Sequence, residues 1–222
     1  MQISRADASK RWWMLVLLSL TLIVLTLNWF DIAAAFPQIS QQFHLNISQL
    51  SNLIALFILG FAIFHIPAGA LAYKIGVKNT LLLGLLVESL GAIACAFAPN
   101  YAVLALLRFV TGIGGSFLVG MTLSLITSWF RGKDLALAMG ISGGACFTLG
   151  QAIGISGWVG VINGVGWQGA IIWVESLELS RFSCVSSSYT LPHMKHIDLS
   201  VAHFRGTLSA ESLATRTSGL LA

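Results

Sequence analysis

The chain has 222 residues, of which 56% are hydrophobic and 9% are charged, and its mean hydropathy is +0.85. A water-soluble domain carries about 25% charged residues, so this composition excludes a soluble globular protein and indicates one that crosses a bilayer several times. The net charge is +4, but the basic residues are scattered over connecting segments, so nucleic-acid binding is not predicted.

Five apolar stretches each reach the ~20 residues that a membrane-spanning helix needs. They cover residues 12–35, 49–72, 80–98, 102–129 and 135–158. Residues 1–11 are expected to be a polar N-terminal segment, and residues 36–46 the outer connection, which contains no lysine or arginine. The sequence therefore predicts an all-α transmembrane helical bundle over residues 12–174, with the lipid bilayer as its surroundings.

In the predicted N-terminal segment and the loops between the five spans, lysine and arginine fall on only one side of the membrane. They occur in the N-terminal segment and in alternate connections: Arg5, Lys10, Arg11, Lys74, Lys78, Arg131 and Lys133. Short cytoplasmic loops collect these residues. We therefore expect a multi-pass protein of the plasma (inner) membrane with its N-terminus in the cytoplasm.

The pattern changes abruptly at residue 174. A sixth apolar run, 169–174, is too short to cross a bilayer, and Glu175 and Glu178 follow it directly. Residues 175–222 are polar and rich in serine, which predicts a disordered tail. We expect five complete spans and a partial sixth, in a truncated or frame-shifted gene product. The alternative is a five-span protein with a natural disordered tail.

Three ionisable residues lie within the predicted spans: Asp31, Glu88 and Arg108. Each costs about 2.5–3.5 kcal/mol at mid-membrane on insertion scales, so each needs a partner or water. Asp31 and Arg108 have matching depths near the outer ends of antiparallel spans. We expect them to face one another across a water-accessible cavity, near its outer end. The alternative is that each extends separately to the surface.

Polar or small neighbours at helical spacing accompany this pair. Asn28 shares a face with Asp31, and Thr111 and Gly115 share a face with Arg108. Gln151 is expected at the same depth and could join them, although an interhelical hydrogen bond in packing explains it equally well.

Small residues at intervals of three or four mark places where helices approach closely. Glu88 shares a face with Gly84 and Gly91, so we expect a protonated or hydrogen-bonded glutamate at a helix contact rather than a cavity residue. The other glycines expected to pack helices are Gly112, Gly115, Gly150 and Gly154.

The sequence shows no nucleophile–base set, metal-ligand cluster or phosphate-binding loop. An enzyme is therefore not predicted, and neither a metal site nor a cofactor is expected.

Three segments resemble motifs of the major facilitator superfamily. The connection after the second span resembles the pattern G-x-L-A-D-[RK]-x-G-[RK]-[RK], with Tyr73 at the aspartate position. The matching residues are Gly69, Leu71, Ala72, Lys74, Gly76 and Lys78. Gly69 and Gly76 are expected to permit a close approach and a reversal of the backbone. The segment that begins at Arg108 resembles the fourth-helix motif R-x-x-x-G-x-G, and Asp31 to Ile39 resembles the first helix and its exit.

This resemblance covers about residues 12–174 and implies the N-terminal half of a fold whose site lies between two six-helix halves. It implies secondary active transport of a small solute by alternating access, as symport with a co-transported proton. The implied substrate or proton pathway contains Asn28, Asp31, Arg108, Thr111 and Gln151. The missing half would come from another chain or from a second copy in a homodimer. The alternative is a non-transporting membrane remnant or an interaction protein.

Overall fold

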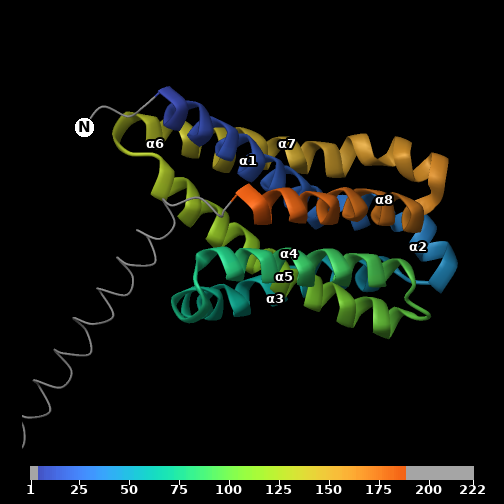
Figure 1. Cartoon of the computed structure of the whole chain (residues 1–222). Coiled ribbons are helices and arrows are strands. Elements are labelled where there is room, and N and C mark those ends of the chain that lie inside the picture. Colours follow the sequence, from blue (N-terminus) through green and yellow to red (C-terminus); the bar gives the residue numbers. More distant parts are fainter. Residues whose placement is uncertain (1–4, 189–222) are drawn as a thin grey trace, which may run out of the picture. The chain divides into compact units, whose positions relative to one another are not determined.

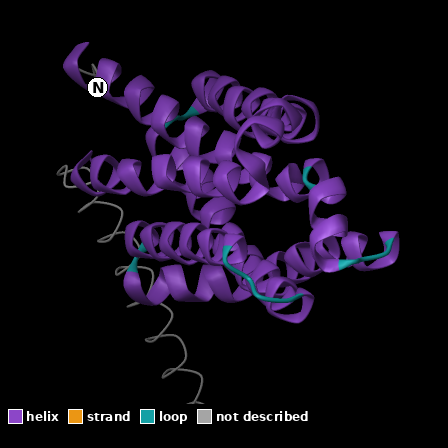
Figure 2. Cartoon of the chain, turned by 90° about the vertical axis from the view of Figure 1, so that its right-hand side faces the viewer, coloured by secondary structure: helices purple, strands orange, loops and turns teal. Residues whose placement is uncertain are grey.

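The computed structural model describes the backbone of residues 5–188 and the side chains of residues 11–180. Every regular element in this part of the chain is a helix, and the connections are short (Figure 2). This confirms the expected all-α fold. In chain order the elements are α1 (Arg5–Ala34), α2 (Phe36–Phe43), α3 (Ile47–Ile75), α4 (Val77–Ala96), α5 (Tyr101–Trp129), α6 (Gly132–Met139), the π-helical turn η1 (Gly140–Cys146), α7 (Phe147–Ala152), the π-helical turn η2 (Ile153–Gly157) and α8 (Trp158–Ser188).

Five helical stretches are long and apolar enough to cross a membrane, as expected. They are Arg11–Ala34, Ile47–Ile75, Val77–Ala96, Tyr101–Trp129 and Gly132–Ser180. Length and apolar character of this kind are the properties of membrane-spanning helices. The protein is therefore a multi-pass integral membrane protein.

The last of these stretches is folded back on itself. It has 49 residues, and a straight helix of that length would measure about 73 Å, more than twice the ~30 Å hydrocarbon core of a bilayer. Gly166 interrupts it with a non-helical φ of 75° and ψ of 164°. At this point the chain turns and the orange part of α8 runs back beside the bundle (Figure 1).

The helix does not end after residue 174, which corrects the expected start of the polar tail. α8 continues to Ser188, and Glu175 and Glu178 are 0% and 1% exposed. The two glutamates look like the end of a span when they are considered alone, whereas the fold places the amide of Asn28 beside Glu175. Residues 189–222 of the expected tail lie outside the described residues, and their disorder stays a prediction.

The connection at 36–46 contains the helix α2. Pro37 lies in the first helical turn, where its missing N–H costs nothing. The side-chain oxygen of Gln38 accepts a hydrogen bond from the backbone N–H of Trp167 at 2.9 Å. The side-chain oxygen of Gln42 accepts one from the indole N–H of Trp167, also at 2.9 Å. α2 is therefore attached to the turn that precedes Trp167.

Of the close approach at Gly69 and the backbone reversal at Gly76 that were expected between α3 and α4, the structure shows only the reversal. Gly76 has a φ of 89°, a conformation that favours glycine, and it separates the two helices. Gly69 instead lies inside α3, and a Cβ there would meet nothing within 4 Å, so no close approach depends on it. The other residues of the motif lie around this turn and are half-buried or exposed: Leu71, Ala72, Lys74 and Lys78.

α5 is packed against both α3 and α4 through glycines. A Cβ on Gly112 would collide with the backbone of Phe57 in α3. A Cβ on Gly114 would lie 2.7 Å from the Cα of Glu88 in α4. From the α4 side, a Cβ on Gly84 would lie 2.6 Å from the Cβ of Phe117. Three helices therefore approach as closely as their backbones allow.

The remaining glycines of the expected packing set make similar contacts. Gly91 faces Thr111 across the α4–α5 contact, where an added Cβ would lie 2.9 Å from the hydroxyl oxygen. A Cβ on Gly115 would lie 3.0 Å from the side chain of Leu25 in α1. In the last helical stretch, Gly150 faces Thr26 and Gly154 faces Leu27. This stretch therefore also packs closely on α1.

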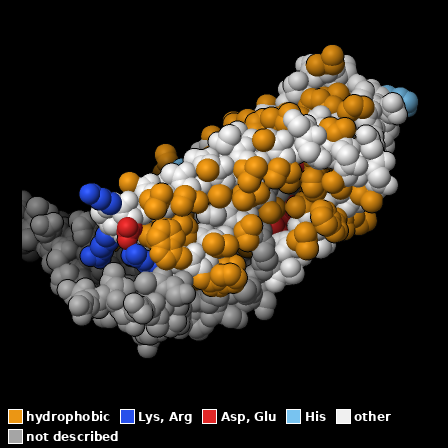
Figure 3. Space-filling model, turned by 90° about the horizontal axis from the view of Figure 1, so that it is seen from above, with side chains coloured by type: hydrophobic (Ala, Val, Ile, Leu, Met, Phe, Trp, Pro, Cys, Tyr) orange, Lys and Arg blue, Asp and Glu red, His pale blue; other side chains and the backbone are white. Residues whose placement is uncertain are grey.

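Basic residues gather at one end of the bundle. The start of α1, the α3–α4 turn and the α5–α6 turn lie at this end (Figure 1) and contain Arg11, Lys74, Lys78, Arg131 and Lys133. Arg11 forms an ion pair with Asp134 at 2.8 Å. The face seen in Figure 3 has its blue side chains at one end, and hydrophobic side chains cover much of the remainder. Such a division is typical of a helical bundle in a bilayer.

Replacing Gly112 by alanine is expected to destabilise the protein by about 1–3 kcal/mol, because the added methyl group must push α3 away from α5. The midpoint of thermal unfolding in detergent measures this effect. Gly69→Ala is the matched control, since it adds the same methyl group to a long helix with open space around it. Equal midpoints for Gly112→Ala and the unaltered protein would contradict the tight contact.

Candidate functional site

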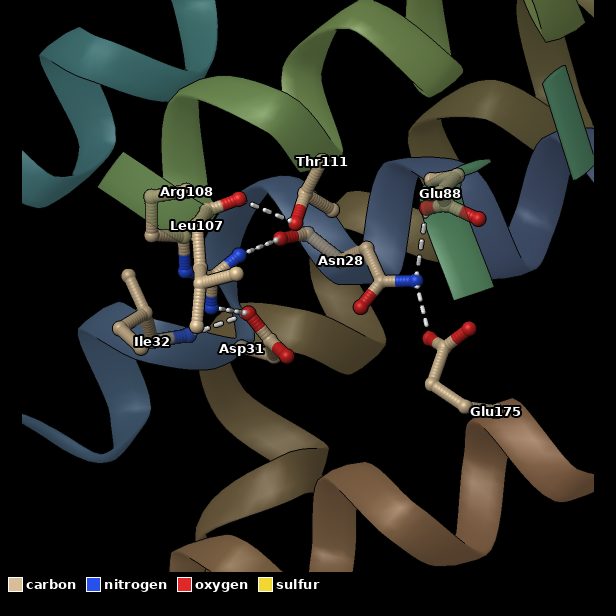
Figure 4. Close-up of polar contacts among 8 residues, drawn as sticks. All are labelled: Asn28, Asp31, Ile32, Glu88, Leu107, Arg108, Thr111 and Glu175. Atoms are coloured by element: carbon tan, nitrogen blue, oxygen red, sulfur yellow. Dashed lines mark hydrogen bonds and ion pairs between the residues drawn. The ribbon is translucent and has the colours of Figure 1, made fainter. Parts of the chain in front are cut away.

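An ion pair is buried between α1 and α5 (Figure 4). Nη2 of Arg108 lies 2.7 Å from Oδ1 of Asp31, and the two side chains are 2% and 1% exposed. Nη1 of Arg108 donates a second hydrogen bond, at 3.1 Å, to the carbonyl oxygen of Asn28. The backbone N–H of Ile32 donates to Oδ1 of Asp31 at 2.5 Å. One guanidinium group therefore binds both a carboxylate and a backbone carbonyl of α1.

The surroundings of this pair differ from those expected. Asp31 and Arg108 are in direct contact inside the bundle, not separated by an open cavity, and neither reaches the surface. Oδ2 of Asp31 and Nε of Arg108 make no hydrogen bond within the described part of the chain. A buried acceptor and a buried donor are thus available beside the ion pair. This arrangement can bind a polar group that offers both hydrogen-bonding partners.

Asn28 connects the ion pair to two further carboxyl groups. Its Nδ2 donates to Oε1 of Glu88 at 2.9 Å and to Oε1 of Glu175 at 2.5 Å. Figure 4 shows that these side chains come from α1, α4 and α8 and converge on the amide. Glu88 therefore joins α4 to α1, beside the glycine contacts that join α4 to α5.

Reasoning from the sequence missed Glu175 as a residue of this site, because it placed residue 175 outside the bundle. A usable signal was present in the spacing. Glu175 and Glu178 are three residues apart, which puts both on one face of a helix. Two carboxyl groups on one face next to an apolar run indicate a polar helix contact as well as they indicate a helix end.

Two other expected residues do not join the ion pair. The hydroxyl group of Thr111 is buried and donates to the carbonyl oxygen of Leu107, one turn earlier in the same helix, at 2.8 Å. Gln151 is half-buried in α7 and, within the described residues, has no hydrogen bond to Asn28, Asp31 or Arg108. The structure thus brings together Asn28, Asp31 and Arg108 and leaves Thr111 and Gln151 apart.

Long apolar helices that enclose paired charges define a polytopic membrane protein with a polar interior. Residues 18–175 match the family model described as the Major Facilitator Superfamily. The chain belongs to this superfamily and corresponds to the N-terminal part of its fold.

Several relatives carry names that describe transport or resistance. The chain is 32% identical to the multidrug resistance protein Stp of Mycobacterium tuberculosis over 57% of this chain and 24% of Stp. It is 24% identical to the riboflavin transporter RibZ of Clostridioides difficile over 73% of this chain and 36% of RibZ. It is 28% identical to a gallate transporter of Pseudomonas putida over 76% of this chain and 37% of that protein. The chain thus spans between 24% and 37% of the length of these relatives.

The variants Asp31→Asn and Arg108→Met are each expected to cost about 3–5 kcal/mol of stability, because each leaves one partner buried without its counter-charge. The double variant should cost less than the sum, with a coupling energy of about 1 kcal/mol or more. Chemical unfolding of all four proteins in detergent gives these values.

The partly exposed pair of Arg11 and Asp134 is the control for that cycle. Its side chains are 19% and 46% exposed, so the cycle of Arg11→Met and Asp134→Asn should give a coupling of about 0–1 kcal/mol. Additive costs for Asp31→Asn and Arg108→Met would show that the buried pair does not act as a unit.

Proposed function

We propose that this chain takes part in secondary active transport of a small solute by alternating access. Membership of the superfamily and relatives named as riboflavin and gallate transporters support membrane transport of small solutes. The observation that carries the proposal is the buried ion pair of Arg108 and Asp31, because each partner keeps one polar atom without a hydrogen bond in the described residues.

The pair provides a way to couple a solute to a proton. Arg108 holds Asp31 while the carboxylate is ionised. A proton on Asp31 removes the negative charge and releases the guanidinium group, which then binds an anionic or polar group of the solute. Loss of that proton restores the ion pair and expels the solute. Solute and proton therefore move in the same direction, which is symport.

In this proposal the other wall of the pathway comes from a second half of the fold or from another copy of this chain. The relatives are longer than this chain, and transporters of this superfamily place the site between two repeated halves. α3 has several large apolar side chains exposed, with Ile66 85% and Ile63 52% exposed. Lipid or a partner half covers such a surface in the membrane.

The basic end of the bundle faces the cytoplasm in this proposal, because short cytoplasmic loops collect lysine and arginine. Lys133→Cys at that end should then react with a membrane-impermeant maleimide only in inside-out vesicles. Ser48→Cys, exposed at the start of α3, should react only in intact spheroplasts. Both variants need a background without Cys95, Cys146 and Cys184. The reverse labelling pattern would require the opposite orientation.

Uptake into liposomes that contain the whole chain tests the proposed function. With riboflavin and gallate as labelled probes and an inward proton gradient, at least one probe should accumulate. Arg108→Lys should lower uptake by about ten-fold or more, because a hydrogen bond to a charged group contributes about 1.5–3 kcal/mol and lysine cannot make both bonds. Arg131→Lys, at an exposed arginine, is the matched control.

The outcome distinguishes the two functions considered. Gradient-driven uptake that Arg108→Lys leaves unchanged would remove the ion pair from the pathway. A chain that folds, inserts and moves neither probe would favour the alternative of a non-transporting membrane protein.

A further inference from the structure

A second buried polar cluster lies beside the ion pair. It consists of Asn28, Glu88, Ser89 and Glu175, from α1, α4 and α8, and we call it the carboxyl cluster. Its members are between 0% and 1% exposed. The ion pair does not use these carboxyl groups, so the transport proposal leaves them without a role.

The carboxyl cluster has more acceptors than donors. The two hydrogens of the Asn28 amide are shared between Glu88 and Glu175, one for each carboxyl group. Oδ1 of Asn28 and Oε2 of Glu175 receive no hydrogen bond from the described residues. The hydroxyl group of Ser89 is fully buried beside Glu175 and can donate to it, but it carries a single hydrogen. Buried polar atoms normally have partners, and this one hydrogen cannot satisfy both Oδ1 of Asn28 and Oε2 of Glu175, so the cluster lacks a donor.

The charges around the carboxyl cluster also indicate that a positively charged partner is missing. Asp31, Glu175 and Glu178 act electrostatically on Glu88, and all four are acidic. Arg108 is the nearby cation, and it is already paired with Asp31. Two ionised carboxylates that share one amide inside a membrane repel one another and lose their hydration, which is costly without a counter-charge. A positively charged ligand removes both costs.

We propose that the carboxyl cluster binds a proton, which Glu88 and Glu175 share. The proton comes from water and adds to a carboxylate oxygen, giving a neutral carboxylic acid and one O–H donor. It supplies the donor that the cluster lacks and removes one negative charge. A metal ion is a poorer fit, because the described residues contain no group of three or more His, Cys, Asp or Glu side chains arranged to hold one.

Asn28 connects this proton site to the ion pair, because one residue binds both. Its side chain donates to the two carboxyl groups, while its backbone carbonyl accepts from Nη1 of Arg108 at 3.1 Å. Loss of the shared proton therefore acts on the same residue of α1 that orients Arg108. The proton site itself does not depend on whether the chain transports a solute.

Infrared spectroscopy of the full chain in lipid nanodiscs tests the proposal, because only a protonated carboxyl group gives the carboxylic-acid C=O stretching band. We expect this band at neutral pH, with a shift in D2O. The double variant Glu88→Gln and Glu175→Gln should lose it, while Asp134→Asn should keep it, since Asp134 is an exposed carboxylate. Glutamine preserves the shape of glutamate and the capacity to accept from Asn28.

Three results would overturn the proposal. The first is the absence of the band from the unaltered protein at neutral pH. The second is an unchanged band in the double variant or, if that variant does not fold, in the single variant Glu175→Gln. The third is a rise in thermal stability with sodium chloride over choline chloride that Glu175→Gln abolishes, which would identify a metal cation as the ligand. None of these measurements depends on solute uptake, so failure here and failure of the transport proposal are distinct.

Discussion

The structure depends on the rule that a charge inside a membrane bundle must find its partner within the protein. Arg108 is tied to α1 through the carboxylate of Asp31 and the carbonyl oxygen of Asn28. α5, which carries Arg108, is in turn packed on α3 and α4 through glycine contacts such as that of Gly112 with Phe57. The polar site and the close packing therefore fix the same helix.

Much of the fold is visible in the sequence because apolar length and loop charge are local properties. The long apolar stretches become α1, α3, α4, α5 and the final helical stretch. α3, α4 and α5 begin and end close to the expected residues, whereas the final stretch runs on to Ser180. Gly76 was correctly identified as a point of reversal, because a φ of 89° is a requirement of one residue and its own backbone. The matched depths of Asp31 and Arg108 also placed two partners that lie far apart in the chain.

The errors concern residues whose role depends on distant neighbours. Glu175 ends an apolar run in the sequence, but the amide of Asn28 on α1 makes it an interior residue. Gly69 matches a family motif, yet no neighbouring helix approaches it. Thr111 shares a helix face with Arg108, but its hydroxyl group binds its own backbone at Leu107. Spacing along a helix shows which face a residue lies on, whereas the residue that it contacts depends on how the other helices pack.

The reversal at Gly166 makes the end of the bundle a helical hairpin, with consequences for its biogenesis. Its returning arm carries Glu175 and Glu178, each of which costs about 2.5–3.5 kcal/mol at mid-membrane, so this arm inserts poorly on its own. Asn28, which offsets part of that cost, is synthesised much earlier, on α1. We therefore expect stable insertion of the returning arm to require that α1, which carries Asn28, is already in the membrane.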